Sequence, residues 1–458
     1  MFTKRFISSV LIVYVSSWVI SLAYFLLQTI GRQITTSEML GFYGRFMTSK
    51  QGIIVQHIFF ILLLLLFFMV RYFIKVYKHK GAKVFFKRLL LRLVLPVATI
   101  VFTLTGIVSY NSSEVYDYKW NSAIENKTPK AVSHFAQDQK HRGMTVYRIG
   151  RNKNFPLDSL VSSNVEWIAI LPYFYQENES SDSIQRRTSL TTWSRSDSSF
   201  IEGIRRIKDK GFKVFLKPHL WLGEGWRSNI QFNDKAKWDT WFASYRKTML
   251  HYARMAAETD SEMLCIGTEL RTAVQQKPEA WHALIAEVRA IYNGQLTYAA
   301  NWDEELDAVT FWDQLDYIGV QAYFPLTANG HPNLEQIKTG WLPHKQRLEA
   351  LARKHNKQVL FTEVGYKKEA DATVRPWEWG SMFSRLFVAK SDKTQVLAYE
   401  ALYSELWYQD WFAGSYIWQW VDSSDFAVKG SPAQNKIAEW YFKIVLEPAP
   451  TTTNSALR

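Results

Sequence analysis

The sequence predicts an α/β protein in which a (β/α)8 TIM barrel follows an all-helical membrane segment of about three spans. Short apolar stretches alternate with helical stretches over roughly 300 residues, a pattern typical of a barrel of parallel strands. Two of the apolar stretches end in a glutamate. Long apolar runs occur only before this region, in the first 110 residues.

The membrane segment is expected over residues 1–110, with spans near 6–30, 52–70 and 93–110. Residues 71–92 contain eight basic residues and no acidic one, so the positive-inside rule places them in the cytoplasm. Lys4 and Arg5 place the N-terminus there as well. Three spans then put the rest of the chain on the outer side, periplasmic or extracellular.

The formal net charge of +13 is confined to the same segment. Residues 1–110 carry 13 basic residues against one acidic residue, Glu38, so the remaining chain is nearly neutral. This distribution excludes a nucleic-acid-binding surface and favours a lipid bilayer as partner. The single cysteine, Cys265, cannot form an intramolecular disulfide, and protein partners stay unknown.

The rest of the chain divides into a polar linker over 111–141, the barrel over 142–445 and a tail over 446–458. Buried parallel strands read as short apolar runs, and helices as apolar residues recurring every three to four positions. Strands are expected at 142–147, 165–175, 213–219, 263–269, 295–301, 315–323, 358–363 and 414–420, and the main helices at 200–210, 235–258, 278–292, 334–355, 395–411 and 433–442.

Two glutamates are the candidate catalytic residues. Glu269 ends the fourth expected strand and Glu363 the seventh, and active sites of such barrels lie at the carboxyl ends of the strands. Strands four and seven face each other across the barrel mouth. A retaining glycosidase needs one carboxylic acid to protonate the leaving oxygen and one carboxylate to attack the anomeric carbon, about 5–5.5 Å apart. We assign Glu269 as acid/base and Glu363 as nucleophile; the alternative is a pair of capping or ion-paired carboxylates.

Other residues at the strand ends fit a sugar-binding site. Polar side chains could contact sugar hydroxyls or the nucleophile, and tryptophans could stack on sugar rings, although core packing is the alternative role for each. The candidate substrate-binding residues are His219, Asn301, Trp302, Tyr323, Trp418, Trp221 and Trp226, and packing is the favoured role for Trp221, Trp226 and Trp420.

Motifs for other chemistries are missing from the sequence. It contains no His-Glu-x-x-His, P-loop, Gly-x-Gly-x-x-Gly or Gly-x-Ser-x-Gly motif, and the ten histidines show no metal-ligand spacing. We therefore expect no metal and no cofactor.

Five short stretches together resemble glycoside hydrolase family 113, of the retaining (β/α)8 clan A: 143–145, 170–173, 216–219, 266–270 and 362–366. The resemblance covers about residues 142–445. It implies endo-β-1,4-mannanase activity, with Glu269 as acid/base and Glu363 as nucleophile. One departure is Thr268, which stands where many clan members have Asn directly before the acid/base.

Three functional hypotheses follow. The first is a membrane-anchored retaining glycosidase that cleaves β-glycosidic bonds of a mannan- or glucomannan-like polysaccharide or oligosaccharide. The second is a non-catalytic membrane protein whose barrel binds glycan or supports a surface assembly; both glutamates being present favours the first over it. The third is a transglycosylase of envelope polysaccharide, which would use the same residues with a sugar acceptor.

Overall fold

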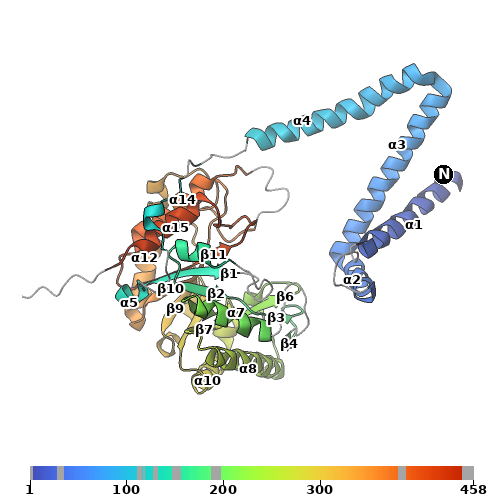
Figure 1. Ribbon diagram of the computed structural model, residues 1–458. Helices are drawn as coiled ribbons and strands as arrows, with labels where there is room; N and C mark the ends of the chain where they lie inside the picture. The colour runs from blue at the N-terminus through green and yellow to red at the C-terminus, as the bar shows by residue number, and fades with distance from the viewer. Residues whose placement is uncertain are drawn as a thin grey trace, which may run out of the picture. The chain divides into compact units, whose positions relative to one another are not determined.

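The computed structural model describes residues 4–27, 36–110, 116, 119–126, 133–146, 156–186, 197–379 and 388–445. The chain divides into two compact units, Met1–Gly106 and Ile107–Arg458 (Figure 1). The first unit is entirely helical over its described residues. The second holds the strands and the helices that surround them.

The second unit is a closed barrel of eight parallel strands, as expected. Neighbouring strands are paired in the order β1-β11-β10-β9-β8-β7-β5-β2, and β2 pairs with β1 to close the ring. The barrel strands are β1 (His141–Val146), β2 (Trp167–Ile170), β5 (Lys213–Leu216), β7 (Met263–Thr268), β8 (Gln295–Asn301), β9 (Tyr317–Gln321), β10 (Val359–Val364) and β11 (Phe412–Trp420).

Alternate side chains of each strand enter two separate cores. In β5, Phe215 joins a cluster inside the barrel, whereas Val214 and Leu216 pack in the larger cluster outside it. The interior cluster also contains Cys265 and Leu360. Both faces of the strands are therefore buried, which explains why they read as continuous apolar runs rather than as alternating patterns.

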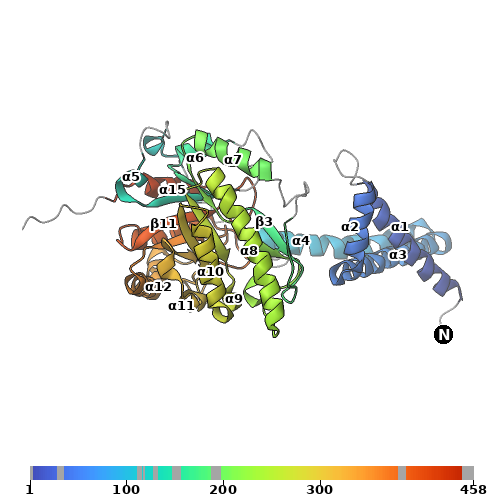
Figure 2. The ribbon, with the colours of Figure 1, turned by 90° about the horizontal axis from the view of Figure 1, so that it is seen from below.

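Helices cover the outside of the barrel (Figure 2). The expected helices at 235–258 and 334–355 form with those bounds, while the one expected at 395–411 begins earlier because the Ser391 side chain accepts a hydrogen bond from Thr394 N. The helices are α6 (Asp158–Ser162), α7 (Asp197–Asp209), α8 (Lys235–Glu258), α9 (Arg271–Gln276), α10 (Pro278–Arg289), α11 (Glu305–Ala308), α12 (Leu334–His355), α14 (Asp392–Leu406) and α15 (Pro432–Phe442), with 3-10 turns at Ser122–Ile124, Arg227–Asn229 (η3) and Trp312–Gln314.

Two of the expected strands continue past a proline, but the observed barrel strands stop before it. The run 165–175 is broken at Pro172, and the run 213–219 is broken at Pro218. Because proline lacks an N–H and cannot continue a ladder, the chain leaves the barrel at both places. The segments beyond form a second sheet of three strands: β3 (Tyr173–Gln176), β4 (Ile184–Gln185) and β6 (His219–Leu222).

The barrel unit also takes up the end of the expected linker. Helix α5 (Phe135–Asp138) packs Phe135 against Trp167 of β2, with ring centroids 5.1 Å apart. Arg142 donates to Asp138 and to the carbonyl of Tyr441, which joins this helix to α15. Residues 133–141 therefore belong to the barrel rather than to a polar linker, and β1 starts at His141.

The first unit consists of long apolar helices. They are α1 (Lys4–Leu27), α2 (Thr36–Thr48), α3 (Lys50–Leu89), a π-helical turn (Leu90–Val94) and α4 (Leu95–Tyr110). Inside α3, Gly81 has φ +76°, which breaks the helix within the basic stretch 71–92. The buried side chains of Gln56 and Ser17 are hydrogen-bonded at 3.0 Å and join α3 to α1.

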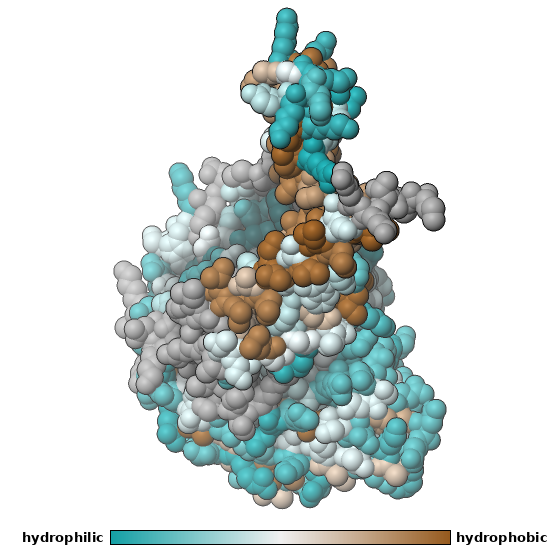
Figure 3. Space-filling view, turned by 90° about the vertical axis from the view of Figure 1, so that its right-hand side faces the viewer, coloured by the Kyte–Doolittle hydropathy of each residue, from teal (hydrophilic) through white to brown (hydrophobic). Residues whose placement is uncertain are grey.

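Two stretches of this unit are long and apolar enough to cross a membrane: Phe6–Leu27 and Lys50–Ser109. The second contains both of the later expected spans. Only 11% of the most apolar window of the first stretch is buried, and 6% of that of the second. The apolar side chains are thus exposed, and Figure 3 shows them as brown atoms gathered over these helices.

Candidate active site

The two candidate glutamates meet at the carboxyl end of the barrel. Glu363 lies in β10, and Glu269 directly follows β7. Their side chains are nearly buried, with exposed fractions of 6% and 5%. The strands β8 and β9 separate them in the ring, and Gln321 at the end of β9 reaches both.

Gln321 limits the distance between the two carboxylates. Its Nε2 lies 3.3 Å from Glu269 Oε1 and 3.1 Å from Glu363 Oε2. The distance between Glu269 Oε1 and Glu363 Oε2 therefore cannot exceed the combined length of these two hydrogen bonds. That limit admits the separation of about 5–5.5 Å that is typical of retaining glycosidases.

Glu363 accepts hydrogen bonds on both carboxylate oxygens. Tyr323 OH donates to Oε1 at 2.6 Å, and Lys217 Nζ donates to Oε2 at 2.8 Å. Burial, followed by the charge of Glu363, raises the pKa of Tyr323 well above its usual value, so the phenol stays a donor. Lys217 also donates to Gln321 Oε1 at 2.7 Å, which turns the amide so that its nitrogen faces the carboxylates.

Glu269 is held differently. Its Oε2 accepts a hydrogen bond of 2.6 Å from Arg227 Nη2, a residue of the loop beyond β6. Its backbone is in the left-handed region, with φ +54°, which is uncommon for a residue that has a Cβ. The Ser228 hydroxyl donates to its carbonyl at 2.8 Å, and its N–H donates to the carbonyl of Ala299 at 2.9 Å.

His219 lies outside the barrel sheet, at the first position of β6. Burial, followed by the charges of Arg227 and Lys217, lowers its pKa well below the usual value. The imidazole is therefore neutral. Its ring centroid lies 5.5 Å from that of Tyr173 on the neighbouring strand. A neutral imidazole can donate or accept a hydrogen bond to a sugar hydroxyl, as the sequence predicts for this residue.

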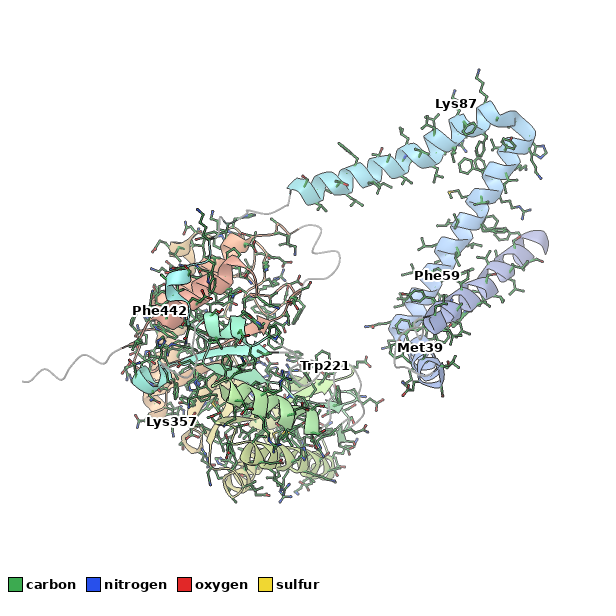
Figure 4. The ribbon with its side chains drawn as sticks, viewed as in Figure 1. Met39, Phe59, Lys87, Trp221, Lys357 and Phe442 are labelled. Carbon is green, nitrogen blue, oxygen red and sulfur yellow. The ribbon has the colours of Figure 1, made fainter. Side chains whose placement is uncertain are left out.

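The expected tryptophans divide into buried and exposed groups. Trp418 is buried in the interior core and Trp420 in the outer core. Trp221 and Trp226 expose 50% and 47% of their surface. Figure 4 shows Trp221 at the end of the barrel opposite Lys357, which precedes β10, so it lies on the carboxyl-end side.

The loops after β8 and β10 bring further aromatic residues to this end. Asn301 Nδ2 donates to Ser228 Oγ at 3.3 Å, and Trp302 packs on Trp377 with ring centroids 5.2 Å apart. Trp379 packs on Phe426 at 4.9 Å. Trp377 and Trp379 expose large parts of their rings.

Sequence analysis missed several residues of this site. Lys217 and Gln321 lie in stretches that were assigned to strands, and Arg227 lies in a loop. The pattern of apolar residues carries no signal for any of them, because each reaches the carboxylates only after distant strands are brought together. Thr268 directs its hydroxyl to Cys265 Sγ at 3.8 Å. Among the described residues, no group of three or more His, Cys, Asp or Glu side chains could hold a metal ion.

A closed parallel barrel with two buried carboxylates at its carboxyl end defines the class of (β/α)8 glycoside hydrolases. The model of Glycoside Hydrolase Family 113 matches residues 150–443, and the chain belongs to that family. A search of curated proteins gives no match.

Solved structures of the family resemble the chain. A GH113 β-1,4-mannanase in a complex is 25% identical with a TM-score of 0.56, over 66% of this chain and 98% of that one. The GH113 β-mannanase of Alicyclobacillus acidocaldarius in complex with ManMIm is 26% identical with a TM-score of 0.56, over 68% of this chain and 99% of that one.

Proposed function

We propose that the protein is a membrane-anchored retaining glycosidase that cleaves β-mannosidic bonds of mannan or glucomannan, with Glu269 as acid/base and Glu363 as nucleophile. The observation that carries the mechanism is Gln321, whose one amide nitrogen contacts both buried carboxylates. Two carboxylates that share one donor can lie at the short separation at which one of them attacks the anomeric carbon directly.

In the first step, Glu363 attacks the anomeric carbon while Glu269 transfers its proton to the departing glycosidic oxygen. In the second step, Glu269 removes a proton from water, the oxygen of that water attacks the anomeric carbon, and Glu363 leaves as a carboxylate. Lys217 and Tyr323 donate hydrogen bonds to the two oxygens of Glu363 and fix its orientation. Gln321 keeps the two carboxylates at a constant spacing.

Mannan is the substrate that the structural neighbours support, since both are β-mannanases by name. The exposed rings of Trp221 and Trp226 lie near the acid/base, and those of Trp377 and Trp379 lie on the loop after the nucleophile strand. Sugar rings stack on aromatic faces, so a chain of several sugars could extend across the mouth in both directions. His219 and Asn301 would contact its hydroxyl groups.

Membrane anchoring is supported by the N-terminal helices. Their apolar side chains are exposed over two stretches long enough to cross a bilayer, and the basic residues gather around the break at Gly81. Helices of a soluble core would bury such side chains instead. The positive-inside rule then places this basic turn and the N-terminus in the cytoplasm and the barrel on the outer side.

The test is release of reducing ends by the full chain in detergent, from β-mannan, glucomannan and a panel of other β-glycans. Glu363→Ala and Glu269→Ala are compared with Glu279→Gln, an exposed carboxylate on α10. We expect activity on mannan that both alanine variants lose and the control keeps. Full activity of Glu363→Ala would contradict the nucleophile assignment, and cleavage of another glycan alone would replace mannan as substrate.

Azide separates the two roles. Azide fills the space of the missing nucleophile in Glu363→Ala and gives an α-glycosyl azide from an activated β-glycoside. In Glu269→Ala it attacks the glycosyl-enzyme instead and gives a β-glycosyl azide. The opposite pattern would exchange the assignments, and binding of glycan without any cleavage would favour a non-catalytic function.

A further inference from the structure

A third buried carboxyl group lies beside the proposed acid/base. Glu305 is at the start of α11, just after β8, and its exposed fraction is 0%. The retaining mechanism needs two carboxyl groups, so it leaves Glu305 without a role. A carboxyl group is costly to bury, and a fold that buries one completely has to satisfy it with hydrogen bonds.

The hydrogen bonds of Glu305 lead to the backbone next to Glu269. Its Oε1 accepts from Tyr298 OH at 2.5 Å, and its Oε2 accepts from Asn301 N at 3.0 Å. The Tyr298 hydroxyl in turn accepts a hydrogen bond of 2.8 Å from the N–H of Leu270. Leu270 directly follows Glu269 in the chain. A continuous path therefore runs from Glu305 through Tyr298 to the peptide that leaves the acid/base.

The direction of these bonds is fixed. Burial raises the pKa of Tyr298 well above its usual value, so its proton stays on the phenol. Leu270 N–H can only donate, hence the phenol must accept from it and use its own proton toward Glu305. Burial also raises the pKa of Glu305 to about 7, and the charge of Glu269 contributes to this in the same direction.

The peptide that receives this support is conformationally unfavourable. With φ +54°, Glu269 has the left-handed backbone that residues with a Cβ rarely adopt, and such a conformation persists only when its surroundings hold it. Ser228 Oγ holds the carbonyl of Glu269, and Asn301 Nδ2 donates to that same Ser228 Oγ. Glu305 thus contacts both supports, through Tyr298 on one side and through the backbone of Asn301 on the other.

We propose that Glu305 is a positioning residue that acts through Tyr298 on the Leu270 peptide and keeps Glu269 in the backbone conformation that directs its carboxyl group at the glycosidic oxygen. This inference rests on the proposed role of Glu269 as acid/base. It assigns to Glu305 and Tyr298 no contact with the substrate.

The experiment compares Glu305→Gln and Tyr298→Phe with Glu304→Gln, an exposed neighbour that pairs with Arg271, in the full chain in detergent. Two substrates are used: β-mannan, whose leaving sugar needs a proton, and a 2,4-dinitrophenyl β-mannoside, whose leaving group needs none. On mannan we expect kcat to fall about 10- to 100-fold in both variants with KM nearly unchanged. The double variant should lose little more than either single one, because both act on one path.

On the dinitrophenyl substrate we expect the initial burst of dinitrophenolate to keep its rate, and azide to accelerate the subsequent turnover, as in Glu269→Ala. A burst that falls as much as mannan cleavage would show a general distortion and would overturn the proposal. Wild-type kcat in both variants would also overturn it. If Glu269→Ala itself shows no azide effect while Glu363→Ala does, the acid/base assignment fails, and that result is independent of Glu305.

Discussion

Glu363 and Glu269 occupy the same end of one barrel, yet the protein holds them in contrasting ways. Glu363 lies within strand β10, and its side chain accepts hydrogen bonds from Lys217, Gln321 and Tyr323, which lie on or just beyond barrel strands. Glu269 lies just beyond its strand in an unfavourable backbone conformation, and its strongest side-chain partner, Arg227, comes from a loop. The carboxylate of Glu363 accepts from three donors, whereas that of Glu269 accepts from Arg227 and Gln321 and its backbone is held by further hydrogen bonds.

This difference fits the two tasks. A nucleophile attacks as a carboxylate and benefits from permanent donors that keep it ionised. An acid/base must exchange a proton twice in each cycle, which suits a carboxyl group with fewer donors than the nucleophile has. Hydrogen bonds to the main chain of Glu269 add to the two donors on its carboxylate in setting its position.

The largest expected effect comes from replacing the two glutamates, and substrates with different leaving groups distinguish their roles. Glu363→Gln should lose on the order of 10⁴-fold or more in kcat on every substrate, because no group forms the covalent bond. Glu269→Gln should lose as much on mannan but release dinitrophenolate in a rapid burst from a dinitrophenyl β-mannoside. Burst kinetics measure this difference. Equal losses of both variants on both substrates would remove the distinction between the two glutamates.

Lys217→Met should weaken chiefly the support of the nucleophile Glu363. The ammonium group lies 2.8 Å from Glu363 Oε2 inside the barrel, and its removal leaves a buried carboxylate with one donor fewer on that oxygen. We expect kcat to fall about 100-fold, with a loss of stability of about 3–5 kcal/mol. Steady-state kinetics and thermal unfolding measure the two effects, with Lys235→Met on the exposed N-terminal turn of α8 as control. A variant with unchanged kcat would assign Lys217 to stability alone.

The raised pKa of Glu305 predicts that the stability of the protein depends on pH. Its pKa is raised from 4.5 to about 7, so the folded protein binds this proton more tightly than the unfolded chain. The contribution of Glu305 to stability is therefore greatest below pH 4.5, decreases by about 3 kcal/mol as pH rises to about 7, and is constant above. Glu305→Gln should remove this decrease. Thermal midpoints of both proteins between pH 4.5 and 8 test it, and parallel curves would contradict it.

The smallest effects are expected from the exposed tryptophans. Trp221→Ala and Trp226→Ala remove half-exposed rings that contact Tyr173 and the Arg227 guanidinium, so stability should change little. If these rings stack on sugars bound beyond the cleavage point, KM for mannan should rise about fivefold with kcat unchanged. Kinetics on long and short mannan oligosaccharides measure this. An equal effect on the shortest cleaved oligosaccharide would place the rings closer to the cleavage point.

The apolar pattern of the chain determined much of the architecture. It located the barrel, the long helices and both glutamates, because strands buried on two faces and apolar helices leave continuous signals in a single sequence. Its two overlong strands had a visible cause at Pro172 and Pro218, where a residue without an N–H stops the ladder. The sequence alone thus gave the fold class and the pair of carboxylates at the strand ends.

Tertiary structure alone decided how those carboxylates are held. Lys217, Gln321 and Arg227 come from separate segments, and each is an ordinary polar residue in its own stretch until the barrel closes. Glu305 also acquires its role only in the folded chain. Its hydrogen bonds lead through Tyr298 of β8 to Leu270, the residue after Glu269 beyond β7. Local patterns report which face of a strand is buried, whereas hydrogen bonds between distant residues depend on register and on ring closure, which no local stretch encodes.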